Sequence, residues 1–500
     1  MKALNIETIR NIECKAIDDI GIPSIVLMEN ASQKVIKSID LNKFKRILII
    51  CGKGNNGANG LAVAKNLKML GQEVELFVVK NDKELVGDYK INYDILKNLN
   101  YRINFLKDVE DLKLLNNSLE NYDLTIDALF GIGLNRELDL FYKEIISVIN
   151  KKSKYIISID VPSGMNGNSG RVMGNCIRAN KTVTFEVYKK GFLSYNSLNY
   201  TGEIVVENIG IPTEILSKCS NVIEITQKSY IQNKIKKRDV YGYKGDYGRV
   251  LIVAGNEGYT GAAYISTQSS VKSGAGLVTL STNRNIKDIL SSKLSEAMIS
   301  SYEDIKELEE LIYKSNGIGI GPGMGNNRNT LENLKTVIKK SKCPIVVDAD
   351  AINVLVDNEE LLKFSSSKII ITPHLGEMAR LLKKDINYIK ENRLELAQKF
   401  AKEYGIIVVL KGFNTIITDG EKNYVNPTGN SAMASGGMGD CLTGIITSFI
   451  AQGYSSLEAA IIATYIHGFI GDVLSESMFS VTATEVINSL PKVLKEFEIN

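Results

Sequence analysis

The sequence has few of the residues from which metal centres and disulfide frameworks are built. Only two of its 500 residues are histidines, which argues against a histidine-rich zinc site. The cysteines are widely scattered and form no CxxC pair, so we expect reduced, mostly buried thiols at Cys14, Cys51, Cys176, Cys219, Cys343 and Cys441. The length suggests two or three domains, each large enough to bury a core without cross-links.

Long apolar runs and a surplus of one charge are also missing. No uninterrupted apolar run reaches the roughly 18 residues of a membrane span, and the start MKALNIETIR lacks the apolar region of a signal peptide. Lys and Arg number 60 against 57 Asp and Glu, with no basic block interleaved with aromatic residues. We therefore expect a cytoplasmic protein that acts on small molecules and binds neither nucleic acid nor membranes.

Apolar strands followed by glycine-rich loops recur through the first half. Residues 46–71 read as a strand, a glycine turn and a helix, after a helix predicted over 6–20. Two later strands end at Asp127 and Asp160, each followed by glycines. A single aspartate at a strand end is commonly a turn former, but three such strand ends in one parallel sheet converge on one crevice. The pattern predicts a Rossmann-like, three-layer α/β domain with a ligand site.

The second half repeats this alternation from residue 241 onward. Strands are expected within 249–254, 277–282, 316–325, 344–350 and 368–377, with a strand, turn and return strand over 405–420 and helices over 330–340 and 387–404. This is the pattern of a mostly parallel sheet covered on both faces. Because composition changes between Ile211 and Arg238, we expect domains at 1–220 and 225–497.

A glycine-rich turn ending in an acidic residue precedes the apolar segment 442–450. Gly436, Gly437 and Gly439 free the backbone to approach a ligand, and the apolar spacing predicts a helix from near Met438. The N–H groups at a helix start would hold a phosphate, and Asp440 would accept a proton. The alternative, an ordinary loop in which Asp440 complements the helix dipole, carries similar weight from GGMGD alone.

Other polar residues of the second half also allow two interpretations. Lys411 is either a phosphate ligand or a solvated turn lysine, and His374, at a strand end, should lie at the crevice mouth. His467, in an apolar helical stretch, reads as a satisfied core or helix-end histidine. Asp348 and Asp350 would share one face of a strand end, where Asp350 either caps a helix or binds a ligand.

The stretch NPTGNSAMASGGMGDCLTG, preceded in order by KGDYG, TPHLGEM and KGFNT, resembles the NAD(P)H-hydrate dehydratases of the ribokinase-like superfamily over residues 225–495. The resemblance implies that hydrated nicotinamide nucleotide contacts Gly325, His374 and Asp440, with magnesium aiding phosphate transfer. It places ADP as co-substrate at two loops: Lys411, Gly412, Phe413, Asn414 and Thr415, and Ser431, Ala432, Met433, Ala434, Ser435, Gly436, Gly437, Met438 and Gly439.

The segments NNGANG, DALFGIGLNRE, DVPSG, VLMENA and TVTF resemble the NAD(P)H-hydrate epimerase domain over residues 1–215. This implies potassium at Asn56, Asp127 and Ser163, and Asp160 as the base. It implies substrate contacts at Asn55, Asn56, Gly57, Ala58, Asn59, Gly131, Ile132, Gly133, Leu134, Asn135, Arg136, Glu137 and Asp160. Asn59 departs from the family pattern NNGGDG, and its amide cannot act as a base.

The two resemblances predict a bifunctional repair enzyme. One domain would interconvert the R and S hydrates of NADH and NADPH, and the other would dehydrate the S hydrate with ADP, yielding NAD(P)H, AMP and phosphate. Two alternatives stay open: a ribokinase-like small-molecule kinase fused to a nucleotide-binding module, and an N-terminal half that binds without catalysing. We also expect a homo-oligomer.

Overall fold

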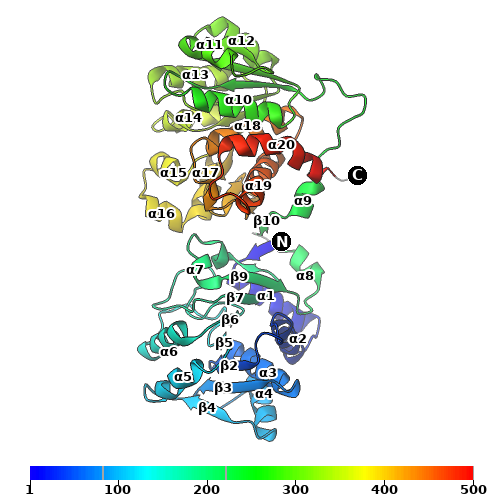
Figure 1. Ribbon diagram of the computed structural model, residues 1–500, viewed down its shortest axis with the longest axis vertical. Coiled ribbons are helices and arrows are strands. Elements are labelled where there is room, and N and C mark those ends of the chain that lie inside the picture. The colour runs from blue at the N-terminus through cyan, green and yellow to red at the C-terminus, as the bar shows by residue number, and fades with distance from the viewer. Residues whose placement is uncertain (81–83, 220–221, 499–500) are drawn as a thin grey trace. The chain divides into compact units, whose positions relative to one another are not determined.

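The computed structural model describes residues 1–80, 84–219 and 222–498 (Figure 1). The chain divides into two compact units, Met1–Val222 and Ile223–Asn500, which are described separately below. Residue 220, where the sequence analysis ended the first domain, lies outside the described residues.

The first unit contains a sheet in which all neighbouring strands are parallel. Its order is β4 (Ile103–Leu106), β3 (Glu73–Val79), β2 (Arg46–Cys51), β5 (Leu124–Ala128), β6 (Ile156–Ile159), β7 (Lys181–Phe185) and β9 (Glu203–Glu207). Short strands β1 (Lys2–Leu4) and β8 (Tyr188–Lys189) pair with each other. The carboxyl ends of β2, β5 and β6 lie side by side, because these strands are parallel neighbours.

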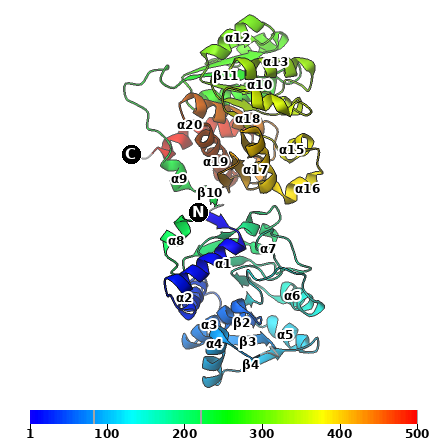
Figure 2. The ribbon, with the colours of Figure 1, turned by 180° about the vertical axis from the view of Figure 1, so that it is seen from behind.

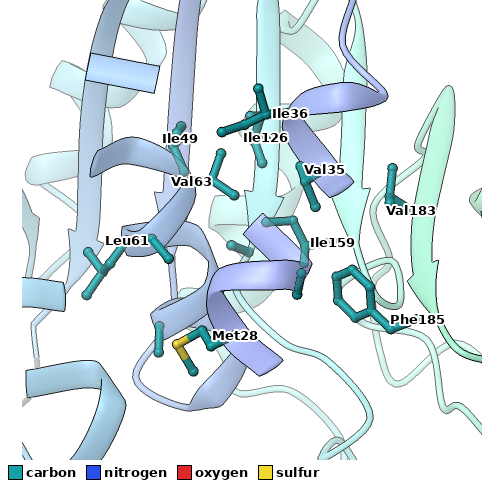
Figure 3. Packing of buried hydrophobic residues seen from close by; sticks show 14 of the residues in the cluster. Met28, Val35, Ile36, Ile49, Leu61, Val63, Ile126, Ile159, Val183 and Phe185 are labelled. Carbon is teal, nitrogen blue, oxygen red and sulfur yellow. The ribbon is translucent and has the colours of Figure 1, made fainter. Parts of the chain in front are cut away.

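Helices cover both faces of this sheet. One core cluster joins Ile47 and Ile49 of β2 to α1 (Ile6–Cys14), α2 (Ser24–Lys37), α3 (Asn55–Met69) and α4 (Gly87–Asn98). The other joins Leu48 and Ile50 to α5 (Asp111–Leu119) and α6 (Leu140–Lys152). Alternate residues of β2 thus face opposite layers, as the strand repeat of two requires. Figure 3 shows the first cluster, where helix residues such as Val35 and Leu61 meet strand residues such as Ile126. The predicted three-layer α/β architecture is confirmed.

The second unit is built on a larger, mostly parallel sheet. Its order is β13 (Met298–Ser301), β12 (Leu277–Thr282), β11 (Arg249–Val253), β14 (Gly317–Ile320), β15 (Ile345–Val347), β16 (Ile369–Ile371), β17 (Ile407–Leu410), β18 (Thr415–Thr418), β19 (Asn423–Asn426) and β10 (Ile223–Ile225). Only the hairpin pairs β17–β18 and β18–β19 are antiparallel. The predicted strand, turn and return strand at 405–420 are therefore confirmed.

The helices of the second unit include three that form a core cluster over the sheet: α18 (Met438–Ala451), α19 (Ser456–Ser475) and α20 (Ala483–Phe497). The others are α9 (Lys228–Gln232), α10 (Thr260–Lys272), α11 (Lys287–Ser291), α12 (Ile305–Lys314), α13 (Arg328–Lys340), α14 (Asp350–Asn353), α15 (Leu375–Leu382), α16 (Ile386–Glu391) and α17 (Arg393–Tyr404). Figure 2 shows the second unit from behind, with α17 and α19 in view. In the described part of the chain, α19 alone has the length and hydropathy of a membrane span. More than half of its apolar stretch is buried inside the protein, as in the core helix of a folded domain.

Two helix predictions need correction. The helix predicted over 6–20 ends at Cys14 and continues as a π-helical turn, Lys15–Asp19. The helix predicted over 387–404 is two helices, because the backbone of Asn392 leaves the helical region at φ −121° and ψ 27°. The cysteine prediction is confirmed for the described residues, where all six thiols are free and four are buried.

Candidate active sites

Asn56 lies in the first turn of α3, directly after the strand β2. Its side-chain amide donates to the carbonyls of Phe130 (2.9 Å) and Ile159 (3.0 Å), which tie the loops after β5 and β6 to α3. Its Oδ1 is buried and has no hydrogen-bond partner among the described residues. A buried amide oxygen without a partner is costly unless a ligand or ion occupies its lone pairs.

Asp127, the next predicted residue, is fully buried at the end of β5. It accepts hydrogen bonds from the Ser158 hydroxyl (2.7 Å) and from both the hydroxyl (2.5 Å) and the N–H (2.9 Å) of Ser163. Burial raises the pKa of Asp127, while these hydrogen bonds oppose that rise. The structure therefore brings Asp127 and Ser163 together, close to the loop that Asn56 holds through the Phe130 carbonyl.

Asp160 follows β6 with a left-handed backbone, φ +67°, which is uncommon for a residue other than glycine. One carboxylate oxygen, Oδ1, pairs with the ammonium of Lys189 at 2.7 Å and accepts from the Thr184 hydroxyl at 3.2 Å. The other, Oδ2, faces Gly131, where an added Cβ would lie 3.3 Å away and equally close to Asn56. Asp160, Asn56 and Gly131 thus converge, as the sequence predicted.

The two loops predicted to hold substrate differ in exposure. Gly57 must be glycine, because a Cβ there would lie 2.0 Å from the Gly52 carbonyl oxygen. Asn59 is partly exposed in the first turn of α3. In the loop 131–137, most residues are exposed or half-buried, but the Leu134 side chain belongs to the core beside α5 and α6. The predicted substrate contact at Leu134 therefore falls to its backbone, since the side chain packs in the core.

Glu13, on α1, was not identified from the sequence. Burial, reinforced by the negative charge of Asp160, raises the pKa of Glu13 to about 7 against the opposing charge of Lys189. The sequence predicted site residues in the glycine-rich loops that follow strands. Neither Glu13 nor Lys189 lies in such a loop, so neither residue was identified. The side-chain cluster of the first unit therefore includes Asp160, Lys189 and Glu13.

In the second unit, the glycine-rich loop ends where predicted, at the start of α18 on Met438. Gly437 caps the helix with φ +87°, and among the described residues no side-chain hydrogen bond caps this helix start. Asp440 lies in the first turn, and burial, together with the nearby Asp348 and Asp350, raises its pKa to about 6. The uncapped N–H groups of this helix start can bind an anion, and a carboxylate whose pKa lies near neutral pH can accept a proton.

Lys411 extends from the end of β17 to this helix start. Its ammonium pairs with Asp348 at 2.7 Å, and a Cβ added at Gly439 would lie 3.1 Å from it. Asp348 is fully buried and also accepts from the Thr443 hydroxyl at 2.7 Å. Burial would lower the pKa of Lys411, but Asp348 and Glu377 outweigh that effect and raise it. The interpretation of Lys411 as a solvated turn lysine is wrong, because it is held by a buried carboxylate.

Asp348 and Asp350 do not share a strand face, which corrects the sequence prediction. The strand β15 ends at Val347, and Ala349 between them has φ +50°, so the alternation of a strand does not extend to them. Asp350 instead accepts from the Gly325 N–H at 2.7 Å and begins α14. It therefore fixes the glycine loop in which Gly325 was predicted to meet the substrate.

His374 follows the strand β16, as predicted, and is the N-terminal cap of α15, a role that the sequence analysis did not anticipate. Its ring Nδ1 accepts from the backbone N–H groups of Gly376 (2.9 Å) and Glu377 (3.3 Å), and the backbone N–H of His374 donates to the Glu377 carboxylate (2.7 Å). The ring is half exposed, and burial with the charges of Lys411 and Arg380 lowers its pKa. Burial raises the pKa of Glu377 to about 7, with Lys411 opposing.

His467 departs in one respect from the sequence prediction. It lies inside α19, and burial lowers its pKa to about 4, with a smaller effect from Lys411. Its Nε2 is buried and has no hydrogen-bond partner among the described residues, whereas the ring is hydrogen-bonded to the Met438 backbone, so the histidine is only partly satisfied.

Hydrogen bonds with residues outside the two predicted nucleotide loops fix both loops. Arg393 of α17 donates to the carbonyls of Phe413 and Asn414, the latter at 3.1 Å, which fixes the loop 411–415. Ser435, in the loop 431–439, donates to the Val481 carbonyl at 3.0 Å. The two loops meet where Lys411 approaches Gly439, so the structure brings part of the predicted nucleotide set together.

Comparisons with known proteins cover both units. Residues 24–191 match the family described as YjeF-related protein N-terminus, and residues 250–492 match NAD(P)H-hydrate dehydratase. A bifunctional NAD(P)H-hydrate repair enzyme from Moorella thermoacetica is 36% identical over 496 residues, covering 95% of this chain and 93% of that protein. The repair enzyme of the same name from Escherichia coli is 30% identical, with 98% and 93% covered.

A solved structure supports the same family for the second unit. The ADP/ATP-dependent NAD(P)H-hydrate dehydratase of Bacillus subtilis, co-crystallised with ATP and Mg2+, is 28% identical with a TM-score of 0.51, and covers 55% of this chain and 99% of that one. The predicted ribokinase-like fold is confirmed, and a kinase fused to a non-catalytic module is not favoured, because the relatives named as repair enzymes span both units. The chain belongs to the family of bifunctional NAD(P)H-hydrate repair enzymes.

Proposed function

We propose that residues 225–497 dehydrate the S hydrate of NADH and NADPH with ADP, and that residues 1–220 interconvert the R and S hydrates. The observation that carries the proposal is the position of Asp440, with a pKa of about 6, in the first turn of α18 beside the Lys411–Asp348 pair. The proposed use of a nucleotide is supported by the similar B. subtilis protein, an ADP/ATP-dependent NAD(P)H-hydrate dehydratase that was co-crystallised with ATP and Mg2+.

In the proposed dehydration, Asp440 accepts the proton of the hydroxyl group on the hydrated nicotinamide ring. The oxygen of that hydroxyl group attacks the terminal phosphate of ADP. The first N–H groups of α18 and the ammonium of Lys411 would stabilise the charge that develops on that phosphate. The ring nitrogen lone pair then expels the phosphorylated oxygen as phosphate, and loss of a proton from the adjacent ring carbon restores the double bond of NAD(P)H, with AMP as the other product. Gly325 and His374, on neighbouring loops, would hold the hydrated nicotinamide.

Magnesium fits this site only as a companion of the nucleotide. No group of three or more His, Cys, Asp and Glu side chains that could hold a metal ion is found in the described parts of the chain. Magnesium commonly binds through one or two carboxylates, waters and the phosphates of a substrate. Near the phosphate, magnesium would neutralise the negative charge of the phosphate oxygens. The carboxylates available to bind it are those of Asp440 and Asp350.

Potassium would bind in the first unit at Asn56, Asp127 and Ser163. The fit rests on Asn56 Oδ1, which is buried without a partner, and on the adjacent buried Asp127 and Ser163 oxygens. Hard oxygen ligands of this mixed kind suit an alkali cation. The ion would order the loop that carries Gly131 and leave Asp160 to do the chemistry.

In the proposed epimerisation, Asp160 acts as the base. Removal of the hydroxyl proton lets the bond from that carbon to the ring nitrogen break, and the nitrogen takes up a proton. Reclosure on the other face of the resulting aldehyde gives the other epimer.

The proposal has three further parts. The protein is cytoplasmic, it forms a homo-oligomer, and its nucleotide contacts lie in the loops 55–59, 131–137, 411–415 and 431–439.

Chromatographic analysis of the purified protein with hydrated NADH and ADP tests the proposal. We expect both epimers to be consumed, with NADH, AMP and phosphate as products. A stable phosphorylated product would instead indicate a kinase, and consumption of one epimer only would indicate a first unit that binds without catalysing.

A further inference from the structure

Lys189 is buried beneath the proposed base of the first unit. Only 1% of the residue is exposed, which is rare for a lysine, and its ammonium contacts Asp160 Oδ1 at 2.7 Å and the Phe185 carbonyl at 3.1 Å. A buried ammonium is costly unless it is paired with an opposite charge and hydrogen-bonded. Asp160 supplies the opposite charge, and the Phe185 carbonyl accepts the hydrogen bond.

The pair divides the two oxygens of the Asp160 carboxylate. Oδ1 is occupied by Lys189 and by the Thr184 hydroxyl, whereas Oδ2 faces Gly131, next to Asn56. A carboxylate rotates freely about its last bond unless its oxygens are held differently. Lys189 and Thr184 hold Oδ1, so Oδ2 is fixed toward the loop predicted to hold the substrate.

The backbone at Asp160 supports the same conclusion. Its left-handed conformation, φ +67°, is unfavourable for a residue with a Cβ and is retained only when the surroundings determine it. Glu13 of α1 interacts electrostatically with both members of the pair, and Arg10 of α1 and Glu186 of the turn between β7 and β8 act in turn on Glu13. Within the described structure, the charged group that pairs directly with Asp160 is Lys189.

We propose that Lys189 is the positioning residue of the epimerase site, which holds Asp160 with one oxygen directed at the substrate. This inference rests on the proposed epimerisation. Because Lys189 is covered by Asp160 and by the Phe185 carbonyl, it acts through the carboxylate and does not itself touch the substrate.

The test measures epimerisation by Lys189→Met in the full chain, with ADP-dependent dehydration of the S hydrate as an internal control. We expect kcat for epimerisation to fall about 10- to 100-fold with KM within about twofold, and dehydration to be unchanged. Lys181→Met is the matched control, because it removes a lysine that pairs with Glu203 at the opposite end of β7. Epimerisation at the wild-type kcat in Lys189→Met would overturn the proposal.

A double variant separates positioning from a general structural role. If Lys189 acts through Asp160, Lys189→Met should cause no further loss of kcat in an Asp160→Asn background. Multiplied losses would overturn the proposal. If Lys189→Met does not fold, Lys189→Arg decides: the wider guanidinium must displace the carboxylate, so kcat must fall at unchanged KM, and an unchanged kcat would refute positioning. A wild-type chain without epimerase activity would refute the proposed function, and this inference with it.

Discussion

Asp440 lies where the hydroxyl and the phosphate would meet in the proposed dehydration. We predict that Asp440→Asn abolishes dehydration but leaves ADP binding within about tenfold, because proton acceptance is lost while the N–H groups of α18 remain. Since the pKa of Asp440 is about 6 and the base must be ionised, the wild-type rate should fall as pH drops through about 6. Steady-state kinetics and ADP titration measure both effects. Turnover at the wild-type rate in the variant would remove Asp440 as the base.

Lys411 links the proposed phosphate site to the buried Asp348. We predict that Lys411→Ala raises the ADP concentration needed for half-maximal dehydration about tenfold, because a charge-assisted contact is lost, and leaves epimerisation unchanged. Lys422→Ala, at an exposed lysine before β19, is the control. An unchanged dependence on ADP would show that Lys411 serves only to neutralise Asp348.

Glu13 gives the first unit a pH-dependent stability. Its pKa is about 7 in the folded protein and about 4.5 otherwise, so the folded state keeps a proton that the unfolded chain releases. Glu13 therefore destabilises the fold increasingly from pH 4.5 to pH 7 and by a constant amount above. We predict that Glu13→Gln stabilises the protein by on the order of 1–3 kcal/mol at pH 8 and much less at pH 5. Calorimetric melting at both pH values checks this, and an equal gain at both would contradict it.

Residue pairs far apart in sequence explain what sequence reasoning missed in the sites. The aspartates and glycines after strands were predictable, because chemistry in a parallel sheet collects at strand ends. The partners of those aspartates were not, since Lys189 and Lys411 are defined by tertiary contacts with Asp160 and Asp348. The same holds for Leu134, whose loop position gave no sign that its side chain fills the core.

At the scale of elements, the start of α18 is the feature on which the second site depends. A Cβ at Gly439 would lie 3.1 Å from the Lys411 ammonium and 3.6 Å from the Asp348 carboxylate. We predict that Gly439→Ala weakens ADP binding about tenfold while changing unfolding free energy by less than about 1 kcal/mol, because alanine favours the helix but crowds the phosphate site.

Gly261→Ala is the matched control for that prediction, because Gly261 lies in the first turn of α10 with open space around its Cβ position. Calorimetric titration with ADP compares the two variants. Equal ADP affinities in both would contradict a role for the close approach at Gly439.

Element order was predictable where apolar strands alternate with glycine turns, and less so where helices change course. The strand ends near Asp127 and Asp160 and the start of α18 lie within one or two residues of expectation. The break at Asn392 was missed, because apolar spacing continues across it and no proline or glycine marks it. The π-helical turn after Cys14 preserves the buried stripe through Ala16 and was hidden for the same reason.

At the scale of the whole molecule, each unit has its own sheet, core and cluster of ionisable residues. The first holds Asp160 with Lys189, and the second holds Asp440 with Lys411 and Asp348. Relatives that match both units over 93% of their own length are named as bifunctional repair enzymes. From these two clusters we predict two sites that act independently on successive forms of one substrate.

The most direct test of two independent sites is the consumption of an equal mixture of R and S hydrates by Asp160→Ala in the presence of ADP. The variant should lose epimerisation yet dehydrate the S hydrate at the wild-type rate, so consumption should stop at about half on a timescale shorter than spontaneous epimerisation. Wild-type protein in the same assay should consume the whole mixture. If a folded Asp160→Ala variant failed to consume the S hydrate, the two sites would not be independent.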